Sequence, residues 1–106
     1  MSLDPRMATM IGFAGKSGKL LTGSYSVEEG IKHKRAKLVL AAADLNPKRI
    51  EILKLWCKDM EIPFHTIGTK DEYGILLKKR PLGLMALTDE QMARGIIQAV
   101  GAERID

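Results

Sequence analysis

The sequence predicts an α/β protein, a three-layer α/β/α sandwich on a small mixed sheet. Apolar runs of strand length alternate along the chain with segments whose apolar residues recur at helical spacing. One run, Leu38 to Ala43, is apolar throughout and has the length of a strand covered on both faces. Asn46 and Pro47 follow it, and such residues are typical of the first positions of a helix. Helices on both faces of one sheet satisfy this alternation, so we expect the 38–43 strand to be central, with Val39 and Leu40 buried.

Size and composition indicate one globular domain over residues 1–106, since 45% of the 106 residues are hydrophobic and 28% are charged. No apolar run reaches the length of a membrane-spanning helix and no signal-peptide pattern is present, so no membrane partner is expected. Cys57 is the only cysteine, which excludes an internal disulfide and favours a reducing, cytoplasmic location. The formal net charge of +4 favours an anionic partner without identifying one.

The chain begins with a predicted helix. Asp4 can cap it, and Pro5 suits its first position because the missing N–H of proline would be unpaired there. Gly15 is expected to end this helix. Residues 1–6 also fit a start extension or an expression scar, with Met7 as the natural start. The apolar residues at helical spacing in this segment are Met7, Met10, Ile11 and Ala14.

The segment from Gly15 to Lys19 resembles a phosphate-binding loop but does not have its spacing. Four residues must separate the first glycine of that motif from a Gly-Lys-Ser/Thr sequence, and counting from Gly12 places Ser17 where glycine is required. We interpret the segment as a flexible basic turn whose Lys16 and Lys19 can contact phosphates. The hypothesis of a nucleotide-binding enzyme depends on this loop alone.

A short strand at 19–22 and a helix at 24–34 are predicted next, with Gly23 between them. Ser26 and Glu29 match a capping box near the helix start, and the first turn of such a helix can receive a phosphate. Basic residues crowd the other end of this helix. We interpret most of them as solvated charge that suits a helix C-terminus.

The helix after Pro47 is predicted to bury a wide apolar face, and Lys48 and Arg49 stand in its first turn, where the helix dipole disfavours cations. The two cations at this unfavourable place have two explanations: they are solvated at the surface, or they lie near a bound phosphate. The residues expected on the apolar face are Ile50, Leu53, Cys57 and Met60, widened by Ile52, Leu55 and Trp56.

Two further strands and two further helices complete the predicted sandwich. A strand at 62–68 precedes a helix with a capping box at Thr69–Glu72, and a strand at 84–88 precedes a helix with a capping box at Thr88–Gln91. Gly101 is expected to end the last helix. The inward residues are Tyr73, Leu76 and Leu77 in the first of these helices, and Met92, Ile96, Ile97 and Val100 in the second.

Residues suited to catalysis do not form a recognisable set. His33 and His65 are far apart in the sequence, and no Cys/His cluster has zinc-ligand spacing. Cys57 lies on an apolar helix face, which is typical of a buried small hydrophobe and not of a nucleophile. Asp44 follows a strand without a base or metal partner, so we assign it to the strand-to-helix turn. We therefore expect no enzyme, no cofactor and no metal.

The stretch Ala36-Lys37-Leu38-Val39-Leu40-Ala41-Ala42-Ala43-Asp44-Leu45-Asn46-Pro47 carries a distinctive pattern, and Ile62-Pro63-Phe64 follows it at a defined spacing. In these residues the chain resembles the kink-turn-binding ribosomal protein family, which includes archaeal L7Ae and the bacterial YlxQ-like proteins. Ile11 to Lys19 and the Thr22-Gly23 turn are similar to the YlxQ-like branch in particular. The resemblance extends from Met7 to Val100 and implies the L7Ae-like form of the sandwich.

The resemblance implies an RNA site at the start of the second helix. The family recognises tandem sheared G·A pairs with a Gly-x-Asn-Glu segment and a lysine one turn later. Matched by spacing, Gly23 keeps the glycine, whereas Tyr25, Ser26 and Glu29 occupy the asparagine, glutamate and lysine positions, with Ser24 as the variable residue. One tyrosine hydroxyl cannot reproduce the paired donor and acceptor of an asparagine. Tyr25 can instead stack on an extruded base, or it can lie unused on the surface.

A second family contact is implied in the loop after the fourth helix, where apolar residues lie against the kinked RNA. Here Lys78, Lys79 and Arg80 precede Pro81 and a leucine, Leu82, that we expect to be exposed. Three consecutive cations beside an exposed leucine suit a nucleic-acid surface. The alternative is a charged helix end followed by a proline stop.

These observations predict a small cytoplasmic RNA-binding protein of bacterial type, associated with the ribosome or translation. Its expected partner is a structured RNA, ribosomal RNA included, or a ribosomal protein, and not DNA. The alternative is a protein-interaction module that kept the fold and lost the kink-turn site, as the residues at the motif positions suggest. The expected RNA-binding residues are Lys16, Lys19, Gly23, Ser24, Tyr25, Ser26, Lys32, Lys79, Arg80 and Leu82.

Overall fold

The computed structural model describes residues 3–103 of the chain, so residues 1–2 and 104–106 of the predicted 1–106 domain lie outside the described part. Helices and strands alternate along it after an initial helix, as predicted. The elements are α1 (Pro5–Lys16), β1 (Leu20–Thr22), α2 (Ser24–Lys32), β2 (Leu38–Ala41), α3 (Pro47–Asp59), β3 (Phe64–Thr66), α4 (Lys70–Leu77), β4 (Leu84–Leu87) and α5 (Glu90–Glu103).

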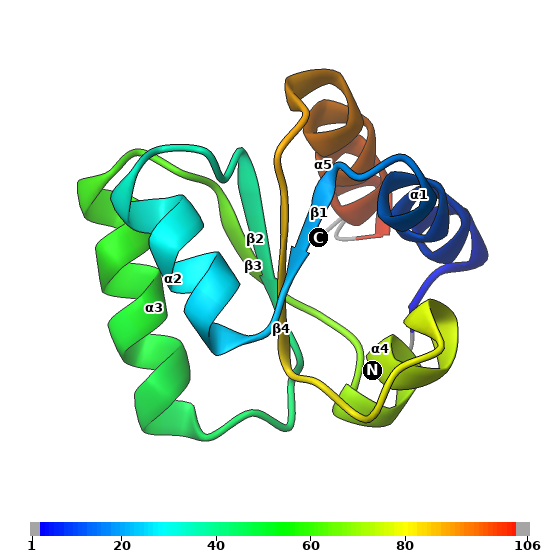
Figure 1. Cartoon of the computed structure of the whole chain (residues 1–106), viewed down its shortest axis with the longest axis horizontal. Helices are drawn as coiled ribbons and strands as arrows, with labels where there is room; N and C mark the ends of the chain where they lie inside the picture. Colours follow the sequence, from blue (N-terminus) through cyan, green and yellow to red (C-terminus); the bar gives the residue numbers. More distant parts are fainter. Residues whose placement is uncertain (1–2, 104–106) are drawn as a thin grey trace.

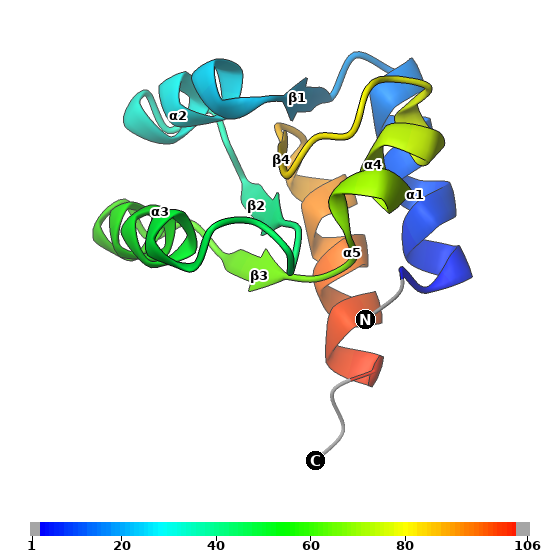
Figure 2. The ribbon, with the colours of Figure 1, turned by 90° about the horizontal axis from the view of Figure 1, so that it is seen from below.

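The four strands form one mixed sheet in the order β1-β4-β2-β3. β2 pairs parallel with β3 and antiparallel with β4, and β1 pairs antiparallel with β4. Helices α2 and α3 cover one face of the sheet, and α1, α4 and α5 cover the other (Figures 1 and 2). This arrangement confirms the predicted three-layer α/β/α sandwich on a small mixed sheet.

Strand β2 is central, and all four of its residues are buried, which confirms the prediction for Val39 and Leu40. Its side chains alternate between the two faces, as strand geometry requires. Val39 and Ala41 join the apolar cluster under α2 and α3, whereas Leu38 and Leu40 join the cluster under α1, α4 and α5. The strand therefore contributes to both halves of the core.

The strands are shorter than predicted because a strand extends only over the residues that pair with the neighbouring strand. β2 ends at Ala41, two residues before the expected end, and Ala43 is exposed. β3 covers only 64–66 of the predicted 62–68, matching the three positions of β2 from Val39 to Ala41. An apolar run therefore marks the strand but overestimates its paired length.

Three predicted helix starts are confirmed by hydrogen bonds from backbone N–H groups to capping side chains. Asp4 accepts from the N–H of Arg6 at 2.7 Å, and Asn46 accepts from that of Lys48 at 2.9 Å. The hydroxyl of Thr69 accepts from the N–H of Glu72 at 3.2 Å. Pro5 and Pro47 occupy the first turns of α1 and α3, as expected.

Two predicted capping boxes are wrong. α2 begins at Ser24 with Gly23 as its N-cap, so Ser26 lies inside the first turn and cannot cap. α5 begins at Glu90, and the side chain of Asp89, not that of Thr88, accepts from the N–H of Met92 at 2.9 Å. Several polar residues near a helix start fit the same motif, and the strand before the helix decides which one is in position.

Three predicted helix ends are also corrected. α1 passes Gly15 and ends at Lys16, while α5 passes Gly101 and reaches Glu103. α2 ends at Lys32 instead of Lys34, because Lys34 adopts a left-handed conformation with φ of 56°. Gly15 is used for packing, since a Cβ there would lie 3.4 Å from Leu77 Cδ2.

Helix α3 buries a narrower face than predicted. Leu53 and Cys57 are fully buried, but Ile52, Leu55 and Trp56 are 46%, 62% and 42% exposed. The helix lies beside α2 and against the edge strand β3, so one narrow stripe is enough to cover the sheet there (Figure 2). Within residues 3–103, no helix combines the length and apolar composition needed to cross a membrane.

Candidate functional site

Three segments that are distant in sequence meet at one end of the sheet: residues 23–26 at the start of α2, the β2–α3 loop at 42–46, and the α4–β4 loop at 78–83 (lower edge of Figure 1). The N–H of Gly23 donates to the carbonyl of Leu84 at 3.0 Å, and the N–H of Ala42 donates to that of Gly83 at 2.9 Å. We call this surface the loop end. It contains the helix start and the basic loop that were predicted to bind RNA.

Gly23 gives α2 an open N-terminus. Its φ of 88° and ψ of 161° are accessible to glycine and strained for other residues. A Cβ there would meet nothing within 4 Å, so the requirement for glycine is conformational and not steric. Because glycine has no capping side chain, the first N–H groups of α2 remain available to an acceptor from outside. These donors and the helix dipole favour an anion or a base carbonyl.

The side chains of this first turn differ in exposure. Tyr25 is 79% exposed, so its ring can stack on a planar partner. Ser24 is exposed as well, and Ser26 is half-buried. The turn therefore combines backbone donors with one free aromatic face.

The acidic residues of α2 are engaged in ion pairs. Glu28 pairs with Arg49 in the first turn of α3, which links the two helices and gives Arg49 a structural partner. Glu29 lies 3.4 Å from His33 Nε2 and 3.7 Å from Lys32 Nζ. The negative charge at the position of the family's lysine is thus partly balanced by neighbours on the same helix.

The basic α4–β4 loop is held close to α4 by Gly74. The N–H of Lys79 donates to the carbonyl of Gly74 at 2.9 Å, and Lys78 ends the helix with a left-handed φ of 55°. A Cβ on Gly74 would lie 3.0 Å from backbone atoms of Lys79, Arg80 and Pro81. Only glycine allows the loop to approach this closely.

Leu82 is not the exposed leucine that was expected. It is half-buried and packs against the apolar cluster under α1, α4 and α5. Its N–H donates to the carbonyl of Lys70 at 3.3 Å, which ties the loop to the start of α4. The burial of Leu82 anchors the loop and leaves Lys79 and Arg80 exposed beside it.

The β2–α3 loop belongs to the loop end, although sequence analysis did not include it in the site. Asp44 accepts a hydrogen bond from the N–H of Lys70 at 3.0 Å. Leu45 lies so close to Gly83 that a Cβ there would be 2.8 Å from Leu45 Cδ1. The proline after Asn46 marked a turn in the sequence, but only tertiary contacts show that this turn lies beside the basic loop.

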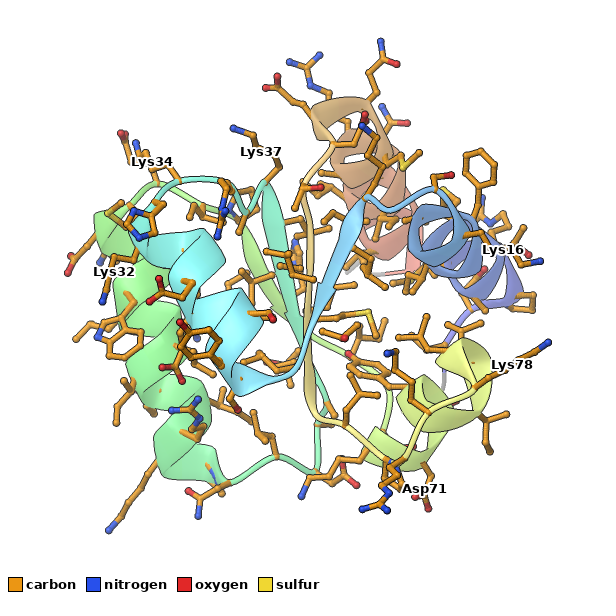
Figure 3. The ribbon with its side chains drawn as sticks, in the orientation of Figure 1. Lys16, Lys32, Lys34, Lys37, Asp71 and Lys78 are labelled. Atoms are coloured by element: carbon orange, nitrogen blue, oxygen red, sulfur yellow. The ribbon has the colours of Figure 1, made fainter. Side chains whose placement is uncertain are left out.

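The structure brings some predicted residues together and separates others. Lys16 and Lys79 line one groove beside the loop end, together with Lys78, which was not included in the predicted site. Lys19 lies at the opposite end of the sheet, where its carbonyl accepts from the N–H of Thr88 at 3.0 Å. Lys32, at the C-terminal end of α2, lies on the other side of the molecule from Lys16 and Lys78 (Figure 3). The predicted residues gathered at the loop end are Gly23, Ser24, Tyr25, Ser26, Lys79, Arg80 and Leu82.

Cys57 and Tyr73 are buried titratable residues in the described part of the chain. No group of three His, Cys, Asp or Glu residues within it could hold a metal ion. Cys57 is fully buried, and burial raises the pKa of its thiol from 9.0 to about 11, so the thiol is neutral near pH 7. Burial, followed by the charges of Glu72 and Asp44, also raises the pKa of Tyr73, whose hydroxyl donates to the carbonyl of Ile67.

Several known proteins similar to this chain are ribosomal. Large ribosomal subunit protein eL8 of Schizosaccharomyces pombe is 30% identical over 91 residues, which cover 74% of this chain and 35% of that protein. The chain spans about a third of the length of the fungal eL8 proteins that it matches. RNA-binding protein YlxQ of Bacillus subtilis is 25% identical over 88 residues, which cover 83% of this chain and 88% of that protein.

Solved structures show the same fold. A protein of unknown function from Bacillus halodurans C has a TM-score of 0.88 at 19% identity, with 92% of this chain and 99% of that chain covered. The Giardia lamblia 15.5kD RNA binding protein has a TM-score of 0.78 at 19% identity, with 95% and 92% covered. The family model described as the ribosomal protein L7Ae/L30e/S12e/Gadd45 family matches residues 6–96. The resemblance expected from the sequence is thereby confirmed, and the chain belongs to the ribosomal protein L7Ae/L30e/S12e/Gadd45 family.

Proposed function

We propose that this protein binds a structured RNA at the loop end and acts in the cytoplasm in association with the ribosome or translation. The observation that carries the proposal is the open N-terminus of α2 at Gly23, which lies beside a basic loop. The family match and the similarity to YlxQ, named as an RNA-binding protein, support the same function. The chain matches YlxQ over most of both proteins, which favours a binding protein of bacterial type.

In this proposal each part of the loop end has a distinct task. The free N–H groups in the first turn of α2 donate to a phosphate or to a base edge. Tyr25 stacks on an unpaired base, since it is exposed and cannot replace an asparagine at a base edge. Lys79 and Arg80 contact backbone phosphates, and the half-buried Leu82 holds their loop in place. The RNA therefore needs an unpaired, accessible base next to a helical segment.

A second candidate function is protein binding, and one observation favours it. Ile52, Leu55 and Trp56 form an exposed apolar stripe along α3, on the side of the molecule away from α1, α4 and α5. Such a stripe would suit a protein partner without using the loop end. The two functions are compatible, because they use different surfaces.

The test of RNA binding is a titration with two RNAs over a salt series. One RNA contains an internal loop with tandem G·A pairs, and the other is a straight duplex of equal length. We expect the internal-loop RNA to bind more tightly, because only it offers unpaired bases. Equal, weak affinity for both RNAs with the same salt slope would indicate non-specific charge attraction and contradict the proposal.

A further inference from the structure

A groove of about 340 Å³ runs along the contact between α1 and α4, on the side of the molecule next to the loop end. Its floor is apolar and includes Leu20, Leu76 and Leu77, while Lys16, Lys78 and Lys79 line its edges. Gly12 and Gly15 of α1 also line it, and their lack of side chains lets Leu76 and Leu77 of α4 pack close to the α1 backbone. The groove thus combines an apolar base with a cationic rim.

The cations of this rim are free of ion pairs within the described residues. Lys16, Lys78 and Lys79 are exposed, and among the side chains of residues 3–101 no carboxylate oxygen lies within 4.0 Å of their ammonium groups. Lys16 and Lys78 extend from the same side of the molecule, whereas Asp71 lies at the other end of α4 (Figure 3). Like charges gathered without counter-charges favour an anionic partner at this position.

The groove is continuous with the loop end. Thr22 lines the groove and directly precedes Gly23, the residue that opens the start of α2. Lys79 lines the groove and directly precedes Arg80 of the basic loop. A chain that leaves the loop end can therefore enter the groove without crossing another element.

We propose that the groove binds a single-stranded segment of the same RNA, next to the part held at the loop end. The lysines contact its phosphates, and the leucine floor packs against ribose and base faces. A single strand fits this combination because unpaired nucleotides expose apolar faces, whereas a duplex exposes mainly phosphates and ribose hydroxyls. The inference rests on the proposed RNA-binding function. It adds that the RNA next to the part bound at the loop end is single-stranded.

The test compares a blunt internal-loop RNA with the same RNA carrying an oligouridine extension on its 5′ or its 3′ end. We expect one of the two extensions to raise the affinity of the wild-type protein by about tenfold, since phosphate contacts and stacking add to binding. The variant Lys16→Ala/Lys78→Ala should lose this gain, which is measured as the ratio of its affinities for the extended and the blunt RNA. Both substitutions are at exposed positions, so the fold should persist.

The matched control is Lys34→Ala/Lys37→Ala, which removes the same charge from two exposed lysines at the opposite end of the sheet (Figure 3). This control should retain the gain from the extension. The groove proposal is overturned if neither extension raises the affinity of the wild type, or if both variants lose the gain equally. Failure of the blunt RNA to bind would instead refute the RNA-binding function, and the groove proposal with it.

Discussion

Tyr25 and Cys57 show how exposure decides the chemistry of a single residue. Tyr25 occupies the asparagine position of the family's motif and is 79% exposed, so its ring is available to a partner. Cys57 is fully buried and its thiol pKa is raised, so it behaves as a small apolar side chain. The sequence left two alternatives open for Tyr25, stacking or an unused surface position, whereas the apolar helix face already indicated burial for Cys57.

Replacing Tyr25 tests the stacking proposed for the loop end. Tyr25→Ala should weaken binding of the internal-loop RNA by about ten- to a hundredfold, because stacking contributes about 1–3 kcal/mol per base. Tyr25→Phe keeps the ring and should bind almost as well as the wild type. Fluorescence anisotropy with labelled RNA measures both. Equal affinity of the alanine variant and the wild type would exclude stacking.

The burial of Cys57 predicts a pH dependence of stability. The thiol ionises above pH 9 in the unfolded chain but only near pH 11 in the folded protein, so the folded state binds more protons between these values. The free energy of unfolding should therefore fall as pH rises through this range, with a contribution from Cys57 on the order of 2 kcal/mol. Urea unfolding at several pH values measures it.

Cys57→Ala is the control for this pH dependence. The variant is less stable than the wild type near neutral pH because it leaves a cavity, but it lacks the thiol titration. The difference in unfolding free energy between the two proteins should narrow as pH rises above 9. Tyr73, whose pKa is also raised, affects both proteins equally. A difference that stays constant with pH would contradict the assignment.

At the scale of elements, the α4–β4 loop depends on a glycine one helix turn before it. A Cβ on Gly74 would lie 3.0 Å from three backbone atoms of the loop, so Gly74→Ala should displace the loop and lower the free energy of unfolding by about 1–3 kcal/mol. Gly12→Ala in α1 is the control, because its Cβ would lie an ordinary 3.7 Å from Leu76 Cδ1. The control should be neutral or slightly stabilising in urea unfolding. Equal stabilities of the two variants would show that the loop adjusts freely.

The same loop should determine the salt dependence of RNA binding. Lys79→Ala/Arg80→Ala removes two proposed phosphate contacts, and each lost contact should reduce the magnitude of the log–log salt slope by about 0.7–0.9. Lys34→Ala/Arg35→Ala removes one lysine and one arginine from the opposite end of the sheet and should leave the slope unchanged. An unchanged slope in the Lys79/Arg80 variant would mean that these residues serve only as a helix terminus.

At the scale of the whole molecule, β2 links the two halves of the core. Leu40→Ala should lower the free energy of unfolding by about 2–5 kcal/mol, since a fully buried leucine leaves a cavity between the sheet and the helices. The control Leu55→Ala makes the same change at a position that is 62% exposed and should alter stability by less than about 0.5 kcal/mol. Similar losses in both variants would contradict the central role of β2.

Much of the architecture was predictable from the sequence, because its determinants are local. The apolar run at 38–43 identified the central strand, and Asn46 and Thr69 located two helix starts through hydrogen bonds within one turn. Gly23 also marked the start of α2, where the backbone angles require glycine. Errors arose where several local motifs competed, as at Ser26 and Thr88, or where a strand depended on the length of its partner.

In contrast, the tertiary structure decided which side chains are exposed and which residues lie close together. Leu82 is half-buried and Leu55 is exposed, although the sequence pattern predicted the reverse for each, because burial depends on which elements lie opposite. The packing of α1 on α4 places Lys16 and Lys78 along one groove, and no local pattern encodes this. The sequence by itself determined the order of elements, the family and the helix start at Gly23, since these follow from neighbouring residues. Only the sheet order and helix packing decided which cations share a surface, because long-range contacts set that proximity.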